Sequence, residues 1–215
     1  MTSLRRLVRQ APVTSAYVGG VALVAAVMEL LGPERANQMA RSASTNLVQL
    51  RRAPVRVLPA SAFVLEDRSQ VLTLPALALT MGTLERWQGS RAAAGTFAAG
   101  HVGATLVVAA GLAGGMTRGL IDPIHREAVD VGVSYGAWAL WGALTPRVDS
   151  RWRPAHVVGS TAMLVHALAR RRSFTDAGHL AAWGIGLSIG ARLAKADSAG
   201  RAAPRAPAAT PQPAR

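Results

Sequence analysis

Long apolar runs alternate with short polar segments along the chain, and their lengths predict helices that cross a membrane. Ala, Val, Leu and Gly continue without a charged residue over stretches close to the roughly 20 residues that a hydrocarbon core of about 30 Å requires. The sequence therefore predicts an all-α membrane protein with six transmembrane helices. We expect these helices at residues 12–31, 71–84, 92–116, 128–145, 155–168 and 175–194.

One apolar segment, residues 57–65 (VLPASAFVL), is too short to be a seventh span. At 1.5 Å per residue it would reach only about 14 Å as a helix. The segment follows an arginine-rich stretch at 32–56 and is interrupted by the charged residues at 66–68. We therefore expect it to be interfacial or re-entrant, with its backbone hydrogen-bonded inside the protein.

The high positive charge does not by itself indicate a nucleic-acid-binding protein. The net charge is +13, but the arginines lie mainly between apolar runs and at the two ends, without an aromatic-interleaved basic patch. Such a distribution is typical of orientation signals in membrane proteins and argues against nucleic-acid binding. The chain has no cysteine, so disulfides and cysteine-ligated metals are excluded, and we expect neither a metal nor a cofactor.

The two ends of the chain suggest how it is organised. Residues 1–11 are short and basic, and the following run is longer than a signal-peptide core, so 12–31 is interpreted as a retained first helix. Residues 12–195 form the predicted membrane domain, and the Ala/Pro/Arg-rich residues 196–215 are expected to be disordered. Six spans would place both termini on one side of the cell membrane, and the basic N-terminus favours the cytoplasm.

Ionisable and polar residues inside predicted spans are candidates for function, because burying them in lipid is costly. Ser134 lies about five residues inside the fourth predicted helix and His179 about four residues inside the sixth, which are parallel in an up-and-down bundle. With a rise of 1.5 Å per residue, both would sit roughly 6–8 Å below the same surface. A histidine within hydrogen-bond reach can activate a serine as a nucleophile, so this pair is a candidate catalytic dyad. The other polar candidates are His101, Asp130 and His166.

Small residues give these two helices a means of contact. Gly132 and Gly136 flank the serine, and Gly186 and Gly190 repeat the same four-residue spacing in the last helix. A purely structural interpretation is also possible, in which Ser134 is a packing residue and His179 is an interface residue. The G-x-S-x-G match at 132–136 is not taken as a nucleophile elbow, because it lies in an apolar helical run without a preceding strand.

Three segments together resemble the rhomboid superfamily of intramembrane serine proteases, and most closely its actinobacterial rhomboid-like branch. They are DVGVSYG (130–136), FTDAGHLAAWGIG (174–186) and TLERWQGSR (83–91), and the resemblance extends over about 46–193. It implies a six-helix rhomboid-like bundle with Ser134 as nucleophile and His179 as base. The short segment at 57–65 falls where rhomboids have a membrane-embedded first loop.

The sequence also departs from the family at positions that matter for chemistry. Active rhomboids carry H-x-x-x-N on the second helix to hold the oxyanion, and the matching positions here are Ser69 and Thr73. Loss of a well-placed oxyanion donor typically slows catalysis by about 10²–10³. Tyr135 replaces the glycine after the nucleophile, and Ala182 replaces a glycine after the histidine. His101 has no catalytic counterpart, and it is either a buried hydrogen-bonding residue or a substitute polar partner.

Three functions are compatible with these features. The first is a serine protease that cleaves transmembrane or juxtamembrane segments of substrate proteins through Ser134 and His179. The second is an inactive rhomboid-like protein that binds membrane clients, which the altered residues on the second helix favour. The third is a small transporter or channel subunit with His101, His166 and Asp130 as a polar path, although no inverted repeat supports it. The lipid bilayer is the expected environment in each case.

Overall fold

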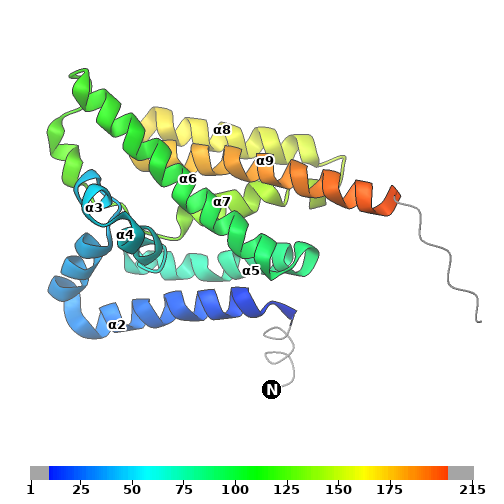
Figure 1. Ribbon diagram of the computed structural model, residues 1–215, viewed down its shortest axis with the longest axis horizontal. Helices are drawn as coiled ribbons and strands as arrows, with labels where there is room; N and C mark the ends of the chain where they lie inside the picture. The colour runs from blue at the N-terminus through cyan, green and yellow to red at the C-terminus, as the bar shows by residue number, and fades with distance from the viewer. Residues whose placement is uncertain (1–9, 203–215) are drawn as a thin grey trace, which may run out of the picture.

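The structure is a computed structural model that describes residues 10–202, and all of its regular secondary structure over that range is helical. Six longer helices carry most of the chain, and Figure 1 shows four of them, α2, α5, α8 and α9, running along the long axis of the molecule. The longer helices are α2 (Pro12–Ala43), α5 (Leu74–Gln88), α6 (Ser90–Thr117), α7 (Ser134–Ala143), α8 (Arg153–Arg171) and α9 (Phe174–Ala202). The shorter ones are α3 (Leu47–Arg52), α4 (Pro54–Ser61) and the 3-10 turns η1 (Arg68–Thr73), η2 (Pro123–Glu127) and η3 (Thr145–Arg147).

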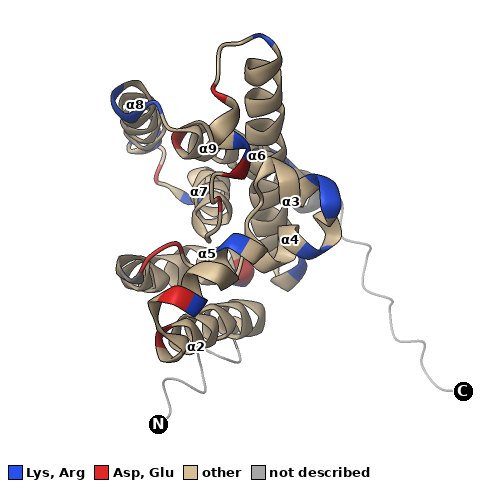
Figure 2. Ribbon diagram, turned by 90° about the vertical axis from the view of Figure 1, so that its left-hand side faces the viewer, with Lys and Arg blue, Asp and Glu red and all other residues tan. Residues whose placement is uncertain are grey.

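Helix α7 lies at the centre of the bundle. It contacts α5, α6 and α9, while α2 packs outside α5 and α8 packs outside α9 (Figure 2). Its position agrees with its composition, since six of its ten residues are buried and none is charged. Helix α8 is the least embedded of the six, with Leu164 as its one buried residue.

The first predicted span ends at a sharp change of direction. Gly32 has φ +78° and is followed by Pro33, so the helix breaks after residue 31 and the chain turns before continuing to Ala43 (Figure 1). Glycine adopts this positive φ at little cost, and proline cannot donate the next helical hydrogen bond. The predicted end at residue 31 therefore matches the break, whereas the following segment is helical, although its arginines had suggested a polar connection.

The fourth predicted helix is the one that the sequence placed least well. It was expected from residue 128, but α7 begins at Ser134, and residues 128–133 are not helical. Distant backbone partners hold this segment out of a helix: Asp130 O accepts from Thr45 N–H, and Gly132 N–H donates to Ser61 O, both at 2.9 Å. Gly132 has φ +128°, a conformation available to glycine and strained for other residues. The serine therefore opens the helix and does not lie inside it.

Helix α4 covers residues 57–61 of the predicted short segment and ends before residues 62–65, and its eight residues are too few to cross a membrane. His101 of α6 fixes it in place, because its Nε2 atom lies 2.9 Å from Ser61 Oγ and 3.1 Å from Leu58 O. His101 is itself buried. Of the two roles considered for this histidine, the structure shows the buried hydrogen-bonding one.

Glu85, near the end of α5, joins three helices. Its buried carboxylate accepts from Val13 N–H at 3.0 Å, from Thr14 N–H at 2.8 Å and from the Thr14 hydroxyl at 2.7 Å. It also accepts from Ser90 Oγ at 2.6 Å, at the start of α6. Helix α2 has no side-chain cap of its own, so Glu85 supplies the acceptors that its first N–H groups lack.

The last helix is longer than predicted. Helix α9 continues to Ala202, past the expected boundary of a disordered tail at residue 196. Asp197 Oδ2 accepts from Trp87 Nε1 and from Gln88 Nε2, each at 2.9 Å, which fastens this end of α9 to α5. The remainder of the predicted tail, 203–215, and most of the predicted N-terminal segment 1–11 lie outside the described residues.

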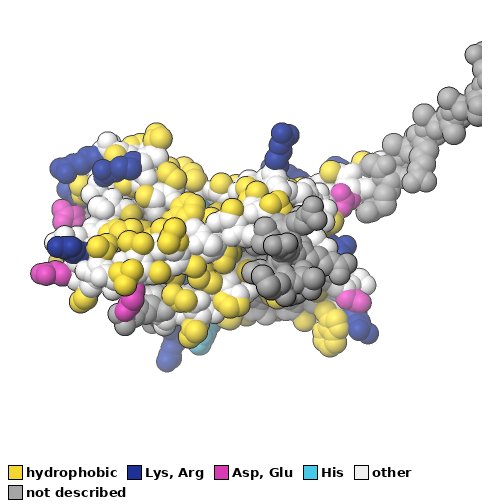
Figure 3. All heavy atoms as spheres, turned by 90° about the horizontal axis from the view of Figure 1, so that it is seen from below, with side chains coloured by type: hydrophobic (Ala, Val, Ile, Leu, Met, Phe, Trp, Pro, Cys, Tyr) yellow, Lys and Arg dark blue, Asp and Glu magenta, His cyan; other side chains and the backbone are white. Residues whose placement is uncertain are grey.

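The surface has the character of a membrane protein. Within residues 10–202, α2 and α6 are the two helices that are long and apolar enough by themselves to cross a bilayer. Hydrophobic side chains spread over the middle of the face that α2 presents, and charged side chains lie mostly towards its ends (Figure 3). Large apolar side chains such as Leu30, Leu79 and Val158 are exposed. The count of six spans stays a prediction at this point.

Candidate functional site

The close contact between α7 and α9 depends on glycines in α9. A Cβ atom on Gly186 would overlap the backbone of Ala139, and one on Gly190 would lie 2.6 Å from the carbonyl oxygen of Ala143. Gly136 plays the same part towards α6, because its missing side chain leaves room for the ring of Phe97. These three predicted packing glycines therefore do allow close helix approach, while Gly132 acts through its positive φ before α7.

Ser134 lies on the floor of a groove between α5 and α8. The groove has a volume of about 690 Å³, and the serine is half-buried at the first position of α7. Leu77 and Leu79 of α5 form one wall, Met163 of α8 belongs to the other, and Trp138 continues the floor. The serine hydroxyl is therefore placed at an apolar channel that opens between two helices.

His179 lies on α9, beside the same end of α7. Its side chain is 17% exposed, and its ring packs against Tyr135 at 5.5 Å and against Trp138 at 6.2 Å between centroids. Its Nε2 atom is buried and has no hydrogen-bond partner within residues 10–202. No hydrogen bond joins Ser134 to His179 over that range, so the structure places the two residues on neighbouring helices without closing the contact between them.

The ring of Tyr135 turns away from the groove and into the bundle. It lies against Gly178, where a Cβ atom would meet the ring carbons and the phenol oxygen, and its hydroxyl donates to Asp130 Oδ1 at 3.2 Å. The ring does not line the groove in which Ser134 lies, because it occupies space that Gly178 leaves free. Tyr135 instead forms part of the support beneath the site.

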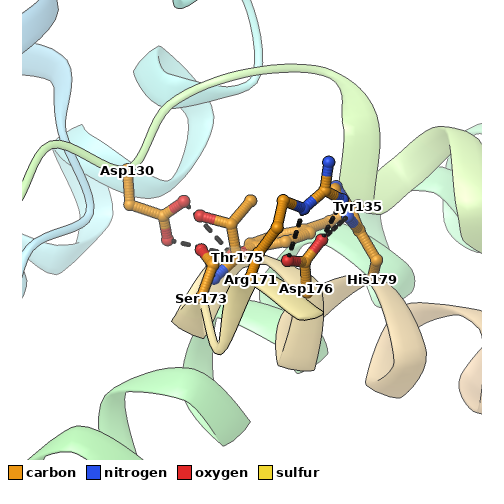
Figure 4. Close-up of polar contacts among 7 residues, drawn as sticks. All are labelled: Asp130, Tyr135, Arg171, Ser173, Thr175, Asp176 and His179. Carbon is orange, nitrogen blue, oxygen red and sulfur yellow. Dashed lines mark hydrogen bonds and ion pairs between the residues drawn. The ribbon is translucent and has the colours of Figure 1, made fainter. Parts of the chain in front are cut away.

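Asp130 anchors the segment that leads to Ser134. Its backbone N–H donates to Ser44 Oγ at 2.9 Å, and its carboxylate accepts from Thr45 Oγ1 at 3.2 Å. The carboxylate also accepts from the Tyr135 hydroxyl, and Figure 4 shows these two residues. Burial raises the pKa of Asp130 from 3.8 to about 6, and the charge of Glu66 acts in the same direction, whereas the hydrogen bonds from Thr45 and Tyr135 oppose the shift. The buried carboxylate is thus a source of pH-dependent stability.

Asp130→Asn is expected to change how stability varies with pH. A carboxyl whose pKa is higher in the folded state favours folding when protonated, so wild-type stability should fall as pH rises from about 4 to 6. The shift from 3.8 to about 6 corresponds to roughly 3 kcal/mol. Asparagine keeps an oxygen that accepts from Tyr135 and removes the charge. Above pH 6 the variant should therefore unfold at a higher temperature than wild type in the same detergent, and the difference should disappear near pH 4. A difference that is constant over this range would contradict the assignment.

A second carboxylate, Asp176, lies close to His179. Its Oδ1 atom is 3.9 Å from His179 Nδ1, and its two oxygens accept from Arg171 Nε at 2.9 Å and from Arg171 NH2 at 2.5 Å (Figure 4). The Asp176 side chain is only 4% exposed, whereas that of Arg171 is 66% exposed. The exposed arginine thus binds the buried carboxylate and keeps it beside the imidazole.

The two predicted oxyanion residues, Ser69 and Thr73, lie in turn η1 and are both exposed. Thr73 lines the groove together with Ser134, but its hydroxyl donates to Gln70 O at 2.6 Å. Ser69 lines a different hollow, against α2, and its backbone N–H donates to Asp67 Oδ1. The structure therefore brings one of the two to the nucleophile.

Several residues of the site were not singled out from the sequence. Trp138 stands four positions after Ser134, and Asp176 three positions before His179, spacings that place each pair on one helix face. Gln70 lines the groove with Ser134 but belongs to no sequence motif.

One polar candidate lies elsewhere: His166 is exposed on α8, away from the groove. Within residues 10–202, no group of three or more His, Asp or Glu side chains is arranged to hold a metal ion.

Comparison with known proteins identifies one family. The family model described as "Rhomboid-like protein" matches residues 6–198, which is most of the 215-residue chain. The match includes Ser134, His179, all of α5, α6 and α7, and most of α9. No curated protein and no solved structure gives a significant match.

Proposed function

Because the chain belongs to the rhomboid-like protein family, we propose that this membrane protein is an intramembrane serine endopeptidase. In this proposal α2, α5, α6, α8 and α9 are transmembrane helices with both termini in the cytoplasm. Helix α7 has ten residues and reaches only about 15 Å, so it crosses the membrane together with residues 128–133 and 144–147 as the fourth of six spans. Ser134 is the nucleophile and His179 the base. The observation that carries the proposal is the position of Ser134, which opens the central helix on the floor of an apolar groove. The neighbouring helix bears a partly buried imidazole, whose Nε2 atom is buried and has no hydrogen-bond partner within residues 10–202.

The chemistry follows that of a serine–histidine pair. His179 Nε2 takes the proton of the Ser134 hydroxyl as Oγ attacks the scissile carbonyl carbon, which gives a tetrahedral oxyanion. The imidazolium then returns the proton to the leaving amine, the C–N bond breaks and an acyl-enzyme remains. Water, deprotonated by the same nitrogen, hydrolyses the ester and restores the serine. A small side-chain movement must first bring Oγ within about 2.6–3.2 Å of Nε2, as is common before substrate binds.

The start of α7 supports stabilisation of the oxyanion. The first backbone bond of the helix runs from Ala137 N–H to Val133 O at 2.9 Å. The N–H groups of Ser134 and of the two residues after it therefore have no acceptor within the helix. Such groups, at the positive end of the helix dipole, favour a developing negative charge. They offer donors that do not depend on the altered side chains of η1.

The groove suggests the class of substrate. Its walls are mainly apolar and it opens between α5 and α8, so a hydrophobic segment can reach the serine from the side of the bundle. Trp141 and Met163 are themselves exposed there. We infer that the substrates are single membrane-spanning proteins whose segments unwind locally at the groove, because a peptide bond inside an intact helix is shielded from attack.

Labelling by a fluorophosphonate probe tests this function. The folded wild-type protein in detergent or lipid should be labelled at Ser134, and Ser134→Ala and His179→Ala should reduce labelling by about 10³-fold or more, because both groups act in one step. Ser160→Ala is a matched control, since this half-buried serine lines the same groove but has no histidine beside it that the proposal uses. Mass spectrometry of the labelled peptide identifies the residue. Folded wild-type protein that remains unlabelled would contradict the proposal.

A second function is favoured by one observation. The absence of a hydrogen bond between Ser134 and His179 within residues 10–202 fits a protein that binds membrane segments in the groove without cleaving them. Such a protein would retain a single-span client equally well in the wild-type and Ser134→Ala forms, and no shorter client fragment would form with either. A fragment that depends on Ser134 would exclude this alternative.

A further inference from the structure

Asp176 lies where a third member of the catalytic group would lie. It precedes His179 by three residues on α9, so the two side chains share one face of the first turns of the helix. Its carboxylate is directed at Nδ1, the ring nitrogen that the proposed proton transfer does not use. The other ring nitrogen, Nε2, is the buried one that lacks a partner within residues 10–202.

The pair with Arg171 explains how the carboxylate stays in place. Both of its oxygens accept from the guanidinium, Oδ2 from Nε at 2.9 Å and Oδ1 from NH2 at 2.5 Å, so the plane of the carboxylate is fixed by two bonds. The arginine lies near the end of α8, and the aspartate lies in the first turn of α9. A residue of α8 therefore orients the aspartate of α9, across the short connection between these two helices.

We propose that Asp176 is a positioning residue for His179: it holds the neutral imidazole with its proton on Nδ1 and leaves Nε2 free to accept the proton of Ser134. The inference rests on the proposed function, because it assigns the work of Nε2. At 3.9 Å the contact is longer than a hydrogen bond of about 2.7–3.2 Å, and it acts through charge until a small ring rotation shortens it. A neutral histidine carries its proton on the nitrogen that has an acceptor beside it, and the other nitrogen is left free to accept.

A purely structural role for Asp176 is the alternative. The carboxylate joins α8 to α9 through Arg171, and an acidic residue in the first turn of a helix is favourable on its own. The two roles differ in what the arginine controls. If the ion pair only stabilises the connection, removal of either partner should have the same consequences. If the aspartate orients His179, its own removal should alter the histidine most, and removal of the arginine should alter it less, because the carboxylate itself remains.

The test is the tautomer of His179, measured by nitrogen NMR on the full-length protein labelled with ¹⁵N-histidine. The His179 signals are those missing from His179→Gln. In wild type the neutral ring should carry its proton on Nδ1. In Asp176→Ala the ratio of the Nδ1–H to the Nε2–H form should fall by about fivefold or more, because the acceptor near Nδ1 is gone. Arg171→Ala loosens the carboxylate but leaves it beside Nδ1, so the ratio should fall by a smaller factor than in Asp176→Ala.

The outcomes separate this inference from the proposed function. A wild-type His179 protonated mainly on Nε2, or equal shifts of the ratio in Asp176→Ala and Arg171→Ala, would overturn the positioning role, and the first result needs no variant of Asp176 or Arg171. If wild-type Ser134 is not labelled by the probe, the endopeptidase proposal fails while the tautomer still decides the role of Asp176. If labelling occurs, its rate should fall about 10- to 100-fold in Asp176→Ala and by a smaller factor in Arg171→Ala, which keeps the carboxylate.

Discussion

Gly186→Ala should destabilise the protein strongly, although alanine is the best helix former. The added Cβ atom would overlap the backbone of Ala139, which cannot move aside as a flexible side chain would. Helices α7 and α9 must therefore separate. Overpacking of this kind costs typically 1–3 kcal/mol, and more against backbone, which outweighs the gain of about 1 kcal/mol from helix propensity. We expect a net loss of about 2–3 kcal/mol, seen as a lower midpoint of thermal unfolding in detergent.

The same substitution two residues earlier provides the control. Gly184 lies on α9 with no atom within 4 Å of the position that a Cβ would take. Gly184→Ala should therefore leave the unfolding temperature unchanged or raise it, by up to about 1 kcal/mol in stability. Gly186→Ala should also reduce probe labelling of Ser134, because the nucleophile and His179 lie on the two helices that are pushed apart. Similar effects of the two variants would contradict the packing that the structure describes.

Glu85→Ala is expected to have the second large effect. The substitution removes the acceptor of four hydrogen bonds, from Val13 N–H, from both donors of Thr14 and from the Ser90 hydroxyl. Each lost bond costs about 1 kcal/mol, and a donor left buried without a partner costs about 1–3 kcal/mol. We expect a loss of about 3–4 kcal/mol and release of α2 from α5, which limited proteolysis near the start of α2 should detect.

Glu34→Ala is a suitable comparison, because Glu34 is an exposed carboxylate on α2, and none of the hydrogen bonds that hold the site involves it. Its stability should stay within about 0.5 kcal/mol of wild type. Glu85→Gln should fall between the two, since the amide keeps one accepting oxygen and replaces the other by a donor. Wild-type stability in Glu85→Ala would show that water replaces the carboxylate without cost and that α2 is not capped in this way.

The longer helices could be predicted because their limits are set locally. The break after residue 31 follows from Gly32 and Pro33, and the boundary between α5 and α6 follows from Gly89, whose φ of +85° suits glycine. The start of α7 could not be found in this way. Residues 128–133 are apolar enough to join the helix, and the groups that prevent it, on Thr45 and Ser61, are far away in the chain.

The site was predictable in part for the same reason. The family resemblance and the glycine spacing predicted that Ser134 and His179 lie on neighbouring helices. The argument from equal depth started from a wrong premise, because Ser134 opens α7 and does not lie five residues inside it. The direction of the Tyr135 ring depends on the space beside Gly178, which is a property of packing and leaves no periodic signal in the sequence. The ion pair between Arg171 and Asp176 also leaves no periodic signal in the sequence.

The unequal anchoring of the two walls of the groove has a consequence for motion. Helix α5 is fastened at one end to α2 and α6 by Glu85 and to α9 through Asp197, whereas α8 has one buried residue and packs mainly along α9. Regions with few buried contacts open at the lowest free energy. Widening of the groove should therefore be a swing of α8 against a stationary α5. In the proposed endopeptidase a single helix would then gate the admission of a substrate, and the speed of that swing would set an upper limit on turnover.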